Sequence, residues 1–384
     1  MKKAIVAVFL LLSSITSAQI PISDHVEISV ITCGPYQGEV YSAFGHSAIR
    51  IYDPLTGQDL AYNYGTFDFD AAFYLNFPRG NLLYKLGVYP YNRFRDFYIS
   101  QNRYVHEQVL NLSSTQKQKV FDYLSRNAQP ENATYRYDYF YNNCATKVRD
   151  VFVELFHDSV KFDGSYVTTN YTIRDLTGLY LKQQPWGELG IDICLGLPMD
   201  KKLTPFEYMF LPDYIESGFD HAKIDGHPIV KAKISVYEAR SETIPFSFFH
   251  PWIVFGLFLV VVIVISLNDW KKKRLTKWFD VVLFSIVGII GILLLLLWVA
   301  TDHQAAAKNF NLLWAIPTHA VAVILLLKKQ YNSFLKKYFI VAGIISAATL
   351  LCWSFLPQQL NVFLVPFVVG LGIRAFIISK ELNK

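Results

Sequence analysis

Long apolar runs separated by short basic loops fill the last third of the chain, whereas the part before them shows shorter and mixed patterns. A helix needs ~20 apolar residues to cross the hydrocarbon core of a bilayer. Five runs approach that length, near residues 252–267, 281–300, 312–327, 338–356 and 362–378. The pattern therefore predicts an all-α, five-helix transmembrane domain over residues 247–384.

Residues 1–18 have the pattern of a signal peptide. Met1 is followed by two lysines, an apolar stretch and the small residues Thr16-Ser17-Ala18. This order is typical of a cleaved export signal, which places the mature N-terminus near Gln19. An uncleaved anchor is the alternative. Both interpretations predict that residues 19–246 are exported.

The exported part mixes two periodicities. Period-two alternation, typical of half-buried strands, occurs at residues 26–31 and 46–52, and residues 61–64 can form a further strand. The last two segments flank turn residues at 53–57, which predicts a hairpin. Helical spacing occurs at residues 114–126 and again after Cys144. Residues 19–246 are therefore predicted to form an α+β domain.

The stretch from Phe67 to Tyr98 is unusually rich in aromatic residues. Aromatic side chains most often fill a core, so core packing is the favoured interpretation. A lipid-facing or substrate-facing excursion is the alternative.

The net charge of +5 hides an asymmetry along the chain. Residues 251–384 contain 13 Lys and Arg against 4 Asp and Glu, whereas residues 1–250 contain 23 against 27. The basic surplus lies between apolar runs, so it indicates membrane orientation rather than nucleic-acid binding. With the exported domain outside, the basic loops fall in the cytoplasm. Arg374, near the inner end of the last run, is expected to extend its side chain to the interface.

Cys144 is the candidate nucleophile. It is predicted at the first turn of a helix, where unpaired backbone N–H groups and the helix dipole favour a thiolate over a thiol. Either Asn142 or Asn143 can cap that helix. An inert buried cysteine is the alternative interpretation.

His46 is the candidate general base. It opens a predicted strand after Gly45, and a neutral imidazole there can accept the thiol proton and later return it. A nucleophile–base pair usually has a third group that orients the base. Asn63, on the adjacent predicted strand, is the first choice for that role, with Tyr62, Tyr64 and Arg50 as competitors. A structural histidine is the alternative for His46.

The other cysteines and the remaining motifs add little chemistry. Cys33 and Cys194 are a possible disulfide pair in an oxidising compartment, and Cys352 is expected to be a small buried side chain inside a span. Neither a phosphate-binding glycine-rich loop nor metal-ligand spacing occurs, so no cofactor and no metal are predicted.

Several strings, in this order, resemble the Lnb family of lipoprotein N-acyltransferases of Bacteroidota. They are Thr32-Cys33-Gly34-Pro35, Phe44-Gly45-His46-Ser47-Ala48-Ile49-Arg50, Asn63-Tyr64-Gly65-Thr66-Phe67, Asn142-Asn143-Cys144-Ala145, Leu195-Gly196-Leu197-Pro198-Met199-Asp200, Glu207-Tyr208-Met209-Phe210-Leu211-Pro212 and Asn309-Phe310-Asn311-Leu312-Leu313-Trp314. A histidine on an early strand and a cysteine opening a later helix also resemble circularly permuted papain-like enzymes, such as NlpC/P60 and lecithin–retinol acyltransferase. The resemblance implies such a fold for the exported domain.

The same resemblance implies an acyltransferase of the bacterial inner membrane, multi-pass, with its catalytic domain facing the periplasm. The implied reaction moves a fatty acyl chain from a phospholipid donor, through a Cys144 thioester, to the N-terminal amine of a diacylglyceryl-lipoprotein acceptor. Two alternatives remain open. One is a membrane-anchored NlpC/P60-like cysteine peptidase or amidase of the cell envelope, and the other is a non-catalytic envelope scaffold.

Candidate substrate contacts fall into two groups. The first group lies near the proposed nucleophile and base in the sequence: Arg50, Tyr64 and Asn143. The second belongs to the loop 301–311 and the run after it: His303, Asn309, Asn311 and His319. That loop is predicted to face the periplasm, and a histidine inside an apolar run is costly and so a candidate for function. Interfacial hydrogen bonding is the alternative for the second group.

Overall fold

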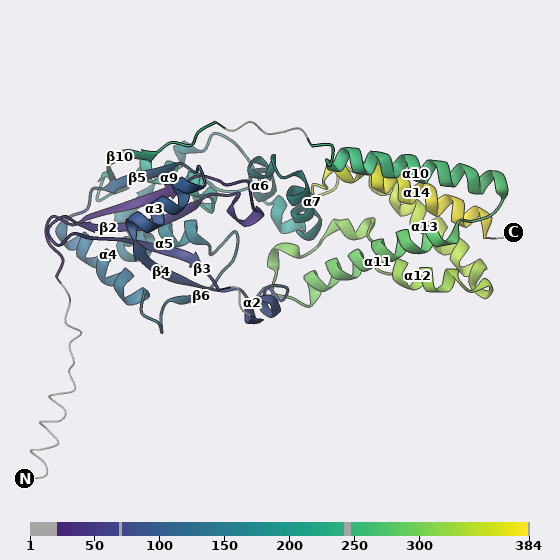
Figure 1. Ribbon diagram of the computed structural model, residues 1–384, viewed down its shortest axis with the longest axis horizontal. Coiled ribbons are helices and arrows are strands. Elements are labelled where there is room, and N and C mark those ends of the chain that lie inside the picture. The colour runs from purple at the N-terminus through teal and green to yellow at the C-terminus, as the bar shows by residue number, and fades with distance from the viewer. Residues whose placement is uncertain (1–20, 69–70, 242–246, 383–384) are drawn as a thin grey trace, which may run out of the picture.

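The computed structural model describes residues 21–68, 71–241 and 247–382. An α+β domain built around a sheet forms one end of an elongated molecule, and helices α10 to α14 form the other (Figure 1). This arrangement confirms an α+β domain followed by a helical one. The predicted signal peptide lies outside the described residues.

The central sheet has seven strands in the order β10-β5-β1-β2-β3-β4-β6, and every neighbouring pair is antiparallel. The strands are β1 (Glu27–Cys33), β2 (His46–Asp53), β3 (Gln58–Thr66), β4 (Leu83–Pro90), β5 (Val105–Leu110), β6 (Thr134–Arg136) and β10 (Val230–Tyr237). A small second sheet joins β7 (Val160–Phe162), β8 (Ala222–Ile224) and β9 (His227–Pro228).

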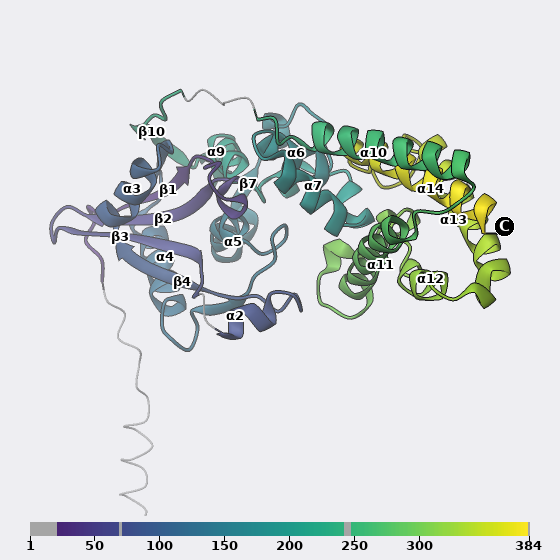
Figure 2. The same cartoon turned by 45° about the vertical axis from the view of Figure 1, so that its right-hand side comes forward.

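Helices cover both faces of the large sheet (Figure 2). On one face α4 (Ser114–Asn127), α5 (Cys144–Phe156) and α9 (Pro212–Asp220) bury apolar side chains against alternate strand positions such as Ile49 and Ile51. On the other face α3 (Tyr91–Ser100) packs its aromatic rings against Ala48 and Ala61. This two-sided burial fixes the register of the strands, because a slip by one residue would exchange the two faces.

The hairpin predicted around residues 53–57 is present, with Ile51 opposite Leu60. Its turn lies at the end of the sheet remote from the membrane helices (Figure 1). His46, which opens β2, and Thr66, which closes β3, therefore lie at the end of the sheet that faces those helices.

Four short helices complete the exported domain: α2 (Ala71–Asn76), α6 (Ile173–Leu181), α7 (Pro185–Cys194) and α8 (Pro205–Tyr208). Of these, α7 lies directly on the membrane domain. Its Leu189 is buried in the same apolar cluster as the membrane helices, and the Trp186 indole donates to the Phe249 carbonyl at 2.8 Å.

Charged and amide side chains reinforce this junction. Asp192 of α7 accepts from the Arg174 guanidinium and from the Asn361 amide, each at 2.8 Å. Arg174 and Asn361 belong to the exported and membrane parts respectively. Buried charge-assisted bonds of this kind have few alternative partners, so they hold the two domains in one orientation.

Among the described residues, four helical segments are long and apolar enough to cross a membrane. They comprise α10 (Pro251–Lys272), α11 (Lys277–Val299), α13 (Asn332–Leu351) and α14 (Val365–Glu381) with the turn before it. The expected third span differs. Its residues form a 3₁₀ turn at Phe310–Leu313 and a short helix, α12 (His319–Leu326). Pro317 lies between them, and a proline disfavours helix at and before its own position.

The expectation that Arg374 extends to the interface is wrong. Its side chain is fully buried among α10, α11 and α14. The guanidinium pairs with Asp280 at 2.7 Å and Asp269 at 2.9 Å, and it donates to the Ser266 hydroxyl at 3.2 Å. Two acidic residues that border the first two apolar runs bind its guanidinium in place of the interface.

Replacing Arg374 by alanine is expected to destabilise the membrane domain by about 3–5 kcal/mol, because two carboxylates would stay buried without their cation. Thermal unfolding in detergent measures the change. The control is Lys337→Ala on the exposed surface of α13, where a change within about 0.5 kcal/mol is expected. Equal melting temperatures for the two variants would contradict the structural role of this ion cluster.

Candidate active site

His46 follows a tight glycine turn. Gly45 has φ of +82°, and a Cβ there would lie 2.8 Å from the Cys33 carbonyl oxygen. Only glycine accepts both the left-handed backbone and that close approach. The turn brings the chain into β2 with His46 as its first residue, paired with Cys33 on β1.

Cys144 is the first residue of α5. The N-cap is Asn143, whose side chain accepts from the Thr146 N–H at 2.9 Å within a complete capping box. The same amide donates to the carbonyls of Tyr139 and Phe210, each at 2.8 Å. Asn143 therefore fixes the start of the helix and, with it, the position of the sulfur.

The structure brings Cys144, His46 and Asn63 together. The imidazole of His46 hydrogen-bonds with the Cys144 thiol, and its Nε2 lies 2.5 Å from Asn63 Oδ1. A carbonyl oxygen accepts, so Nε2 carries the proton and Nδ1 is left for the sulfur. The ring also stacks on Tyr98 of α3, with centroids 5.8 Å apart. Asn63 and Tyr98 together hold the plane of the imidazole.

Electrostatics at the pair favour ionised sulfur. Burial by itself raises the pKa of the Cys144 thiol. The charge and hydrogen bond of His46, together with the N–H groups of Ser47 and Ala145, lower it by more. As a result, the pKa of Cys144 lies below its usual value. Burial lowers the pKa of His46, and the neighbouring sulfur and Asn63 raise it by more. The two shifts are those of a thiolate–imidazolium pair, the reactive form of a cysteine nucleophile.

Gly65 borders the sulfur and was not among the candidates from the sequence. It has φ of +92°, and a Cβ there would lie 3.5 Å from Cys144 Cβ and 3.9 Å from both His46 Cε1 and the Tyr137 ring. The missing side chain leaves room beside the Cys144 sulfur. A signal existed, because Gly65 belongs to the string Asn63-Tyr64-Gly65-Thr66-Phe67 that carries the family resemblance.

The candidate substrate contacts of the first group have other partners. The guanidinium of Arg50 pairs with Asp59 at 2.7 Å and Glu107 at 2.9 Å. Tyr64 is buried in the core, where its hydroxyl accepts from the Asn127 amide at 3.0 Å. Asn143 is engaged in capping. None of the three turns a free polar group toward Cys144.

The second group lies in the membrane domain and its outer loop. Asn309 and Asn311 are buried, and their amides donate to the Ile193 and Asp192 carbonyls of α7 at 2.8 and 2.9 Å. His319 is buried at the start of α12, bonded to the Tyr338 hydroxyl at 2.8 Å.

His303 contacts the turn after α2, through a 3.0 Å hydrogen bond to the Phe77 carbonyl. The structure gives the loop 301–311 a role in joining the domains.

The other cysteines show no comparable environment. All four cysteines lie in described segments and are free, so the considered Cys33–Cys194 disulfide is absent. Burial raises the pKa of Cys33 far above its usual value, which keeps it a thiol. Cys352 is exposed on the apolar helical domain rather than buried as expected. Within the described segments, no group of His, Cys, Asp and Glu could hold a metal ion.

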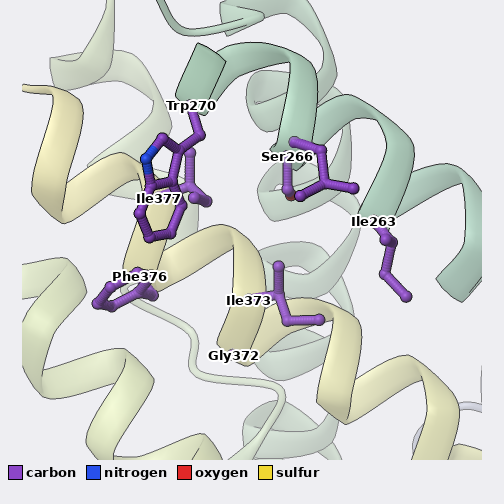
Figure 3. A pocket seen from close by; sticks show the side chains of 8 residues that line it. Ile263, Ser266, Trp270, Gly372, Ile373, Phe376 and Ile377 are labelled. Atoms are coloured by element: carbon purple, nitrogen blue, oxygen red, sulfur yellow. The ribbon is translucent and has the colours of Figure 1, made fainter. Parts of the chain in front are cut away.

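One groove lies far from this chemistry, between α10 and α14 (Figure 3). It has a volume of about 400 Å³, and its lining is almost entirely apolar: Ile263, Ser266, Leu267, Trp270, Gly372, Ile373, Phe376 and Ile377. The one hydroxyl among them, that of Ser266, accepts from Arg374. The groove has no reactive group and lies between two apolar helices of the membrane domain.

Fold and site together define a membrane protein whose α+β domain carries a Cys–His pair at the end that faces its membrane helices. Residues 19–177 match the Lnb N-terminal periplasmic domain, and residues 243–384 match the Lnb transmembrane domain. The chain therefore belongs to the Lnb family. It is an inner-membrane protein of lipoprotein biogenesis with its N-terminal domain in the periplasm. No curated protein and no solved structure matches the chain.

Proposed function

We propose that this protein is a lipoprotein N-acyltransferase that carries a fatty acyl chain on Cys144. The observation that supports it most directly is the contact between Cys144 and His46, with Asn63 on the far side of the ring. His46 opens β2 at the end of that strand nearer the membrane helices, and Cys144 contacts it there (Figure 1 shows the strand). Both the phospholipid ester and the lipidated amine of a lipoprotein lie at that membrane surface.

In the first half-reaction, the Cys144 thiolate attacks the ester carbonyl of a phospholipid. The carbon–oxygen ester bond breaks, the imidazolium of His46 gives its proton to the departing lysophospholipid, and a thioester remains on Cys144. Backbone N–H groups at the start of α5 are the candidate donors to the oxyanion.

In the second half-reaction, the free α-amine of a diacylglyceryl-lipoprotein attacks the thioester. His46, now neutral, accepts a proton from the attacking amine, the carbon–sulfur bond breaks, and the thiolate–imidazolium pair is restored. Asn63 acts as a positioning residue in both halves, because it keeps the Nε2 proton in place and Nδ1 directed at the sulfur. No redox step or cofactor is required.

We infer that the chain crosses the membrane five times, although the third segment contains only a short helix. Asn311 contacts α7 of the periplasmic domain, whereas the Leu326 carbonyl accepts from the Lys277 ammonium at the inner start of α11. Residues 311–326 thus reach from the outer junction to the cytoplasmic end of α11. A broken segment of this kind is tolerated where protein surrounds it.

The membrane domain favours acyl transfer over the peptidase or amidase alternative. A peptidase would use the same thiol chemistry with water as acceptor, and it would need a single anchor. Several membrane helices joined rigidly to the catalytic domain suit substrates that approach within the lipid plane.

The proposed function is tested by the mass of the peptide that contains Cys144. The full-length protein, purified with membrane phospholipid, is expected to carry a fatty acyl mass on this peptide that hydroxylamine removes. The Cys144→Ser variant should not carry the hydroxylamine-labile adduct. Adding a synthetic diacylglyceryl-lipopeptide should move the acyl group to its N-terminal amine. An unmodified Cys144 that nonetheless cleaves envelope peptides would favour the peptidase instead.

A further inference from the structure

A row of stacked aromatic rings leads away from the Cys–His pair. Tyr137 borders the space beside Gly65 and Cys144. Its ring stacks on Tyr84 with centroids 4.2 Å apart, Tyr84 stacks on Phe67 at 4.6 Å, and Phe67 stacks on Phe73 at 5.2 Å. Phe73 belongs to α2, so the row connects the neighbourhood of the sulfur with that helix.

The far end of the row is an exposed apolar patch. Tyr74, Leu75 and Phe77 are 65%, 63% and 42% exposed. We call these three residues the α2 patch. Scattered exposed apolar side chains are ordinary, but a cluster at the end of a partly buried aromatic row marks a binding surface.

The α2 patch is held at the height of the outer membrane interface. The span α11 ends at Val299, and the loop after it is bonded to the turn that follows α2. The Asp302 N–H donates to the Arg79 carbonyl at 2.8 Å, and the Asp302 carboxylate pairs with Arg136 at 2.7 Å. Both views place α2 beside the outer end of α11 (Figures 1 and 2).

We propose that the α2 patch inserts into the outer leaflet and that the aromatic row leads one phospholipid acyl chain from there to Cys144. The patch adjoins the outer end of α11, a helix long and apolar enough to cross a membrane, which favours lipid over a protein partner as its occupant. Tyrosine rings suit this boundary, because they are apolar along their faces and polar at the hydroxyl. The proposal rests on the proposed function for the fate of the acyl chain, but not for the membrane contact.

The membrane contact is tested with a photo-crosslinking residue at position 75, and at position 55 as a control. Leu55 lies in the β2–β3 turn and is 68% exposed, so it matches Leu75 in chemistry and exposure. The full-length Cys144→Ala protein is reconstituted in phosphatidylethanolamine–phosphatidylglycerol vesicles and irradiated. A phospholipid adduct at 75 and none at 55 is expected. Equal lipid labelling at the two positions, or an adduct with another protein at 75, would overturn the proposal.

The route to the sulfur is tested by comparing the double variant Tyr74→Gln/Leu75→Gln with the control variant Leu55→Gln. Thioester formation from vesicle phospholipid should fall about tenfold or more in the double variant, because two apolar side chains lose their lipid contact. Alkylation of Cys144 by iodoacetamide should be unchanged in both proteins, which shows that the site is intact. Unchanged thioester formation in the double variant would overturn the route.

The two proposals fail separately. If no protein forms a thioester but position 75 still labels lipid, the acyltransferase proposal fails while the membrane contact stands. If the wild-type protein forms the thioester but position 75 labels no lipid, the α2 patch is overturned while the acyltransferase proposal stands.

Discussion

Replacing Cys144 by alanine is expected to abolish acyl transfer, with a rate at least about 10³-fold below that of the wild-type protein. Removal of the nucleophile leaves no atom to carry the acyl group, and a covalent enzyme then keeps only what binding and the oxyanion donors supply. Since the side chain is small and only partly buried, the fold should tolerate the change. The measurement is the mass of lipoprotein N-termini in cells that produce the variant alone, which should carry two acyl chains rather than three.

Cys194→Ala is the matched control. Cys194 is also a free cysteine, at the end of α7, where partial desolvation raises the pKa of its thiol rather than lowering it. This variant should keep full activity. If the Cys144→Ala protein still supports complete lipoprotein acylation, the thiol is not the nucleophile. The non-catalytic envelope scaffold then becomes the favoured interpretation.

Much of the α+β domain follows from local pattern. The alternation at residues 46–52 and the turn residues after it predicted the β2–β3 hairpin, because successive side chains of a strand point to opposite faces of the sheet. The start of α5 beside Cys144 was also predictable, since asparagine caps a helix by accepting from its free N–H groups. The order of the seven strands was not predictable. It depends on β5 and β10 pairing across long sequence separations, which no local pattern records.

Hydropathy alone predicted the membrane domain only in part. The apolar run at 312–327 suggested a continuous span, but it contains Pro317 and forms only the short helix α12. Arg374 was expected at the interface because hydropathy considers each residue without its partners. In the fold, Asp280 and Asp269 come from two other helices and bury its charge.

The candidate site was also only partly predictable from the sequence. Cys144, His46 and Asn63 were proposed from helix-start and strand chemistry, and the fold places them in contact. Within the second group, the loop residues were chosen because their loop was predicted to face the periplasm. That criterion cannot separate substrate contacts from the buried amides of a domain junction, which is where Asn309 and Asn311 lie. Gly65 and Tyr137 were missed because they matter only through their position beside Cys144, which the sequence pattern does not show.

Replacing His46 by alanine is expected to lower the rate of thioester formation by about 10²–10⁴-fold, the usual contribution of a general acid–base group. The pH dependence gives the specific signature. In the wild-type protein the pKa of Cys144 lies below its usual value, so alkylation by iodoacetamide should already be fast below the pH at which a free thiol ionises. Without His46, its charge and hydrogen bond are lost while burial still disfavours the thiolate, so the pKa must rise.

The alkylation profile of His46→Ala should therefore move to higher pH, and alkylation at neutral pH should slow. His25→Ala is the control, because His25 is exposed ahead of β1 and should leave both profile and activity unchanged. A purely structural histidine would give a different result, in which activity falls through lost stability while the pH midpoint of Cys144 alkylation stays where it was. That outcome would separate His46 from the chemistry and leave the thiolate without its base.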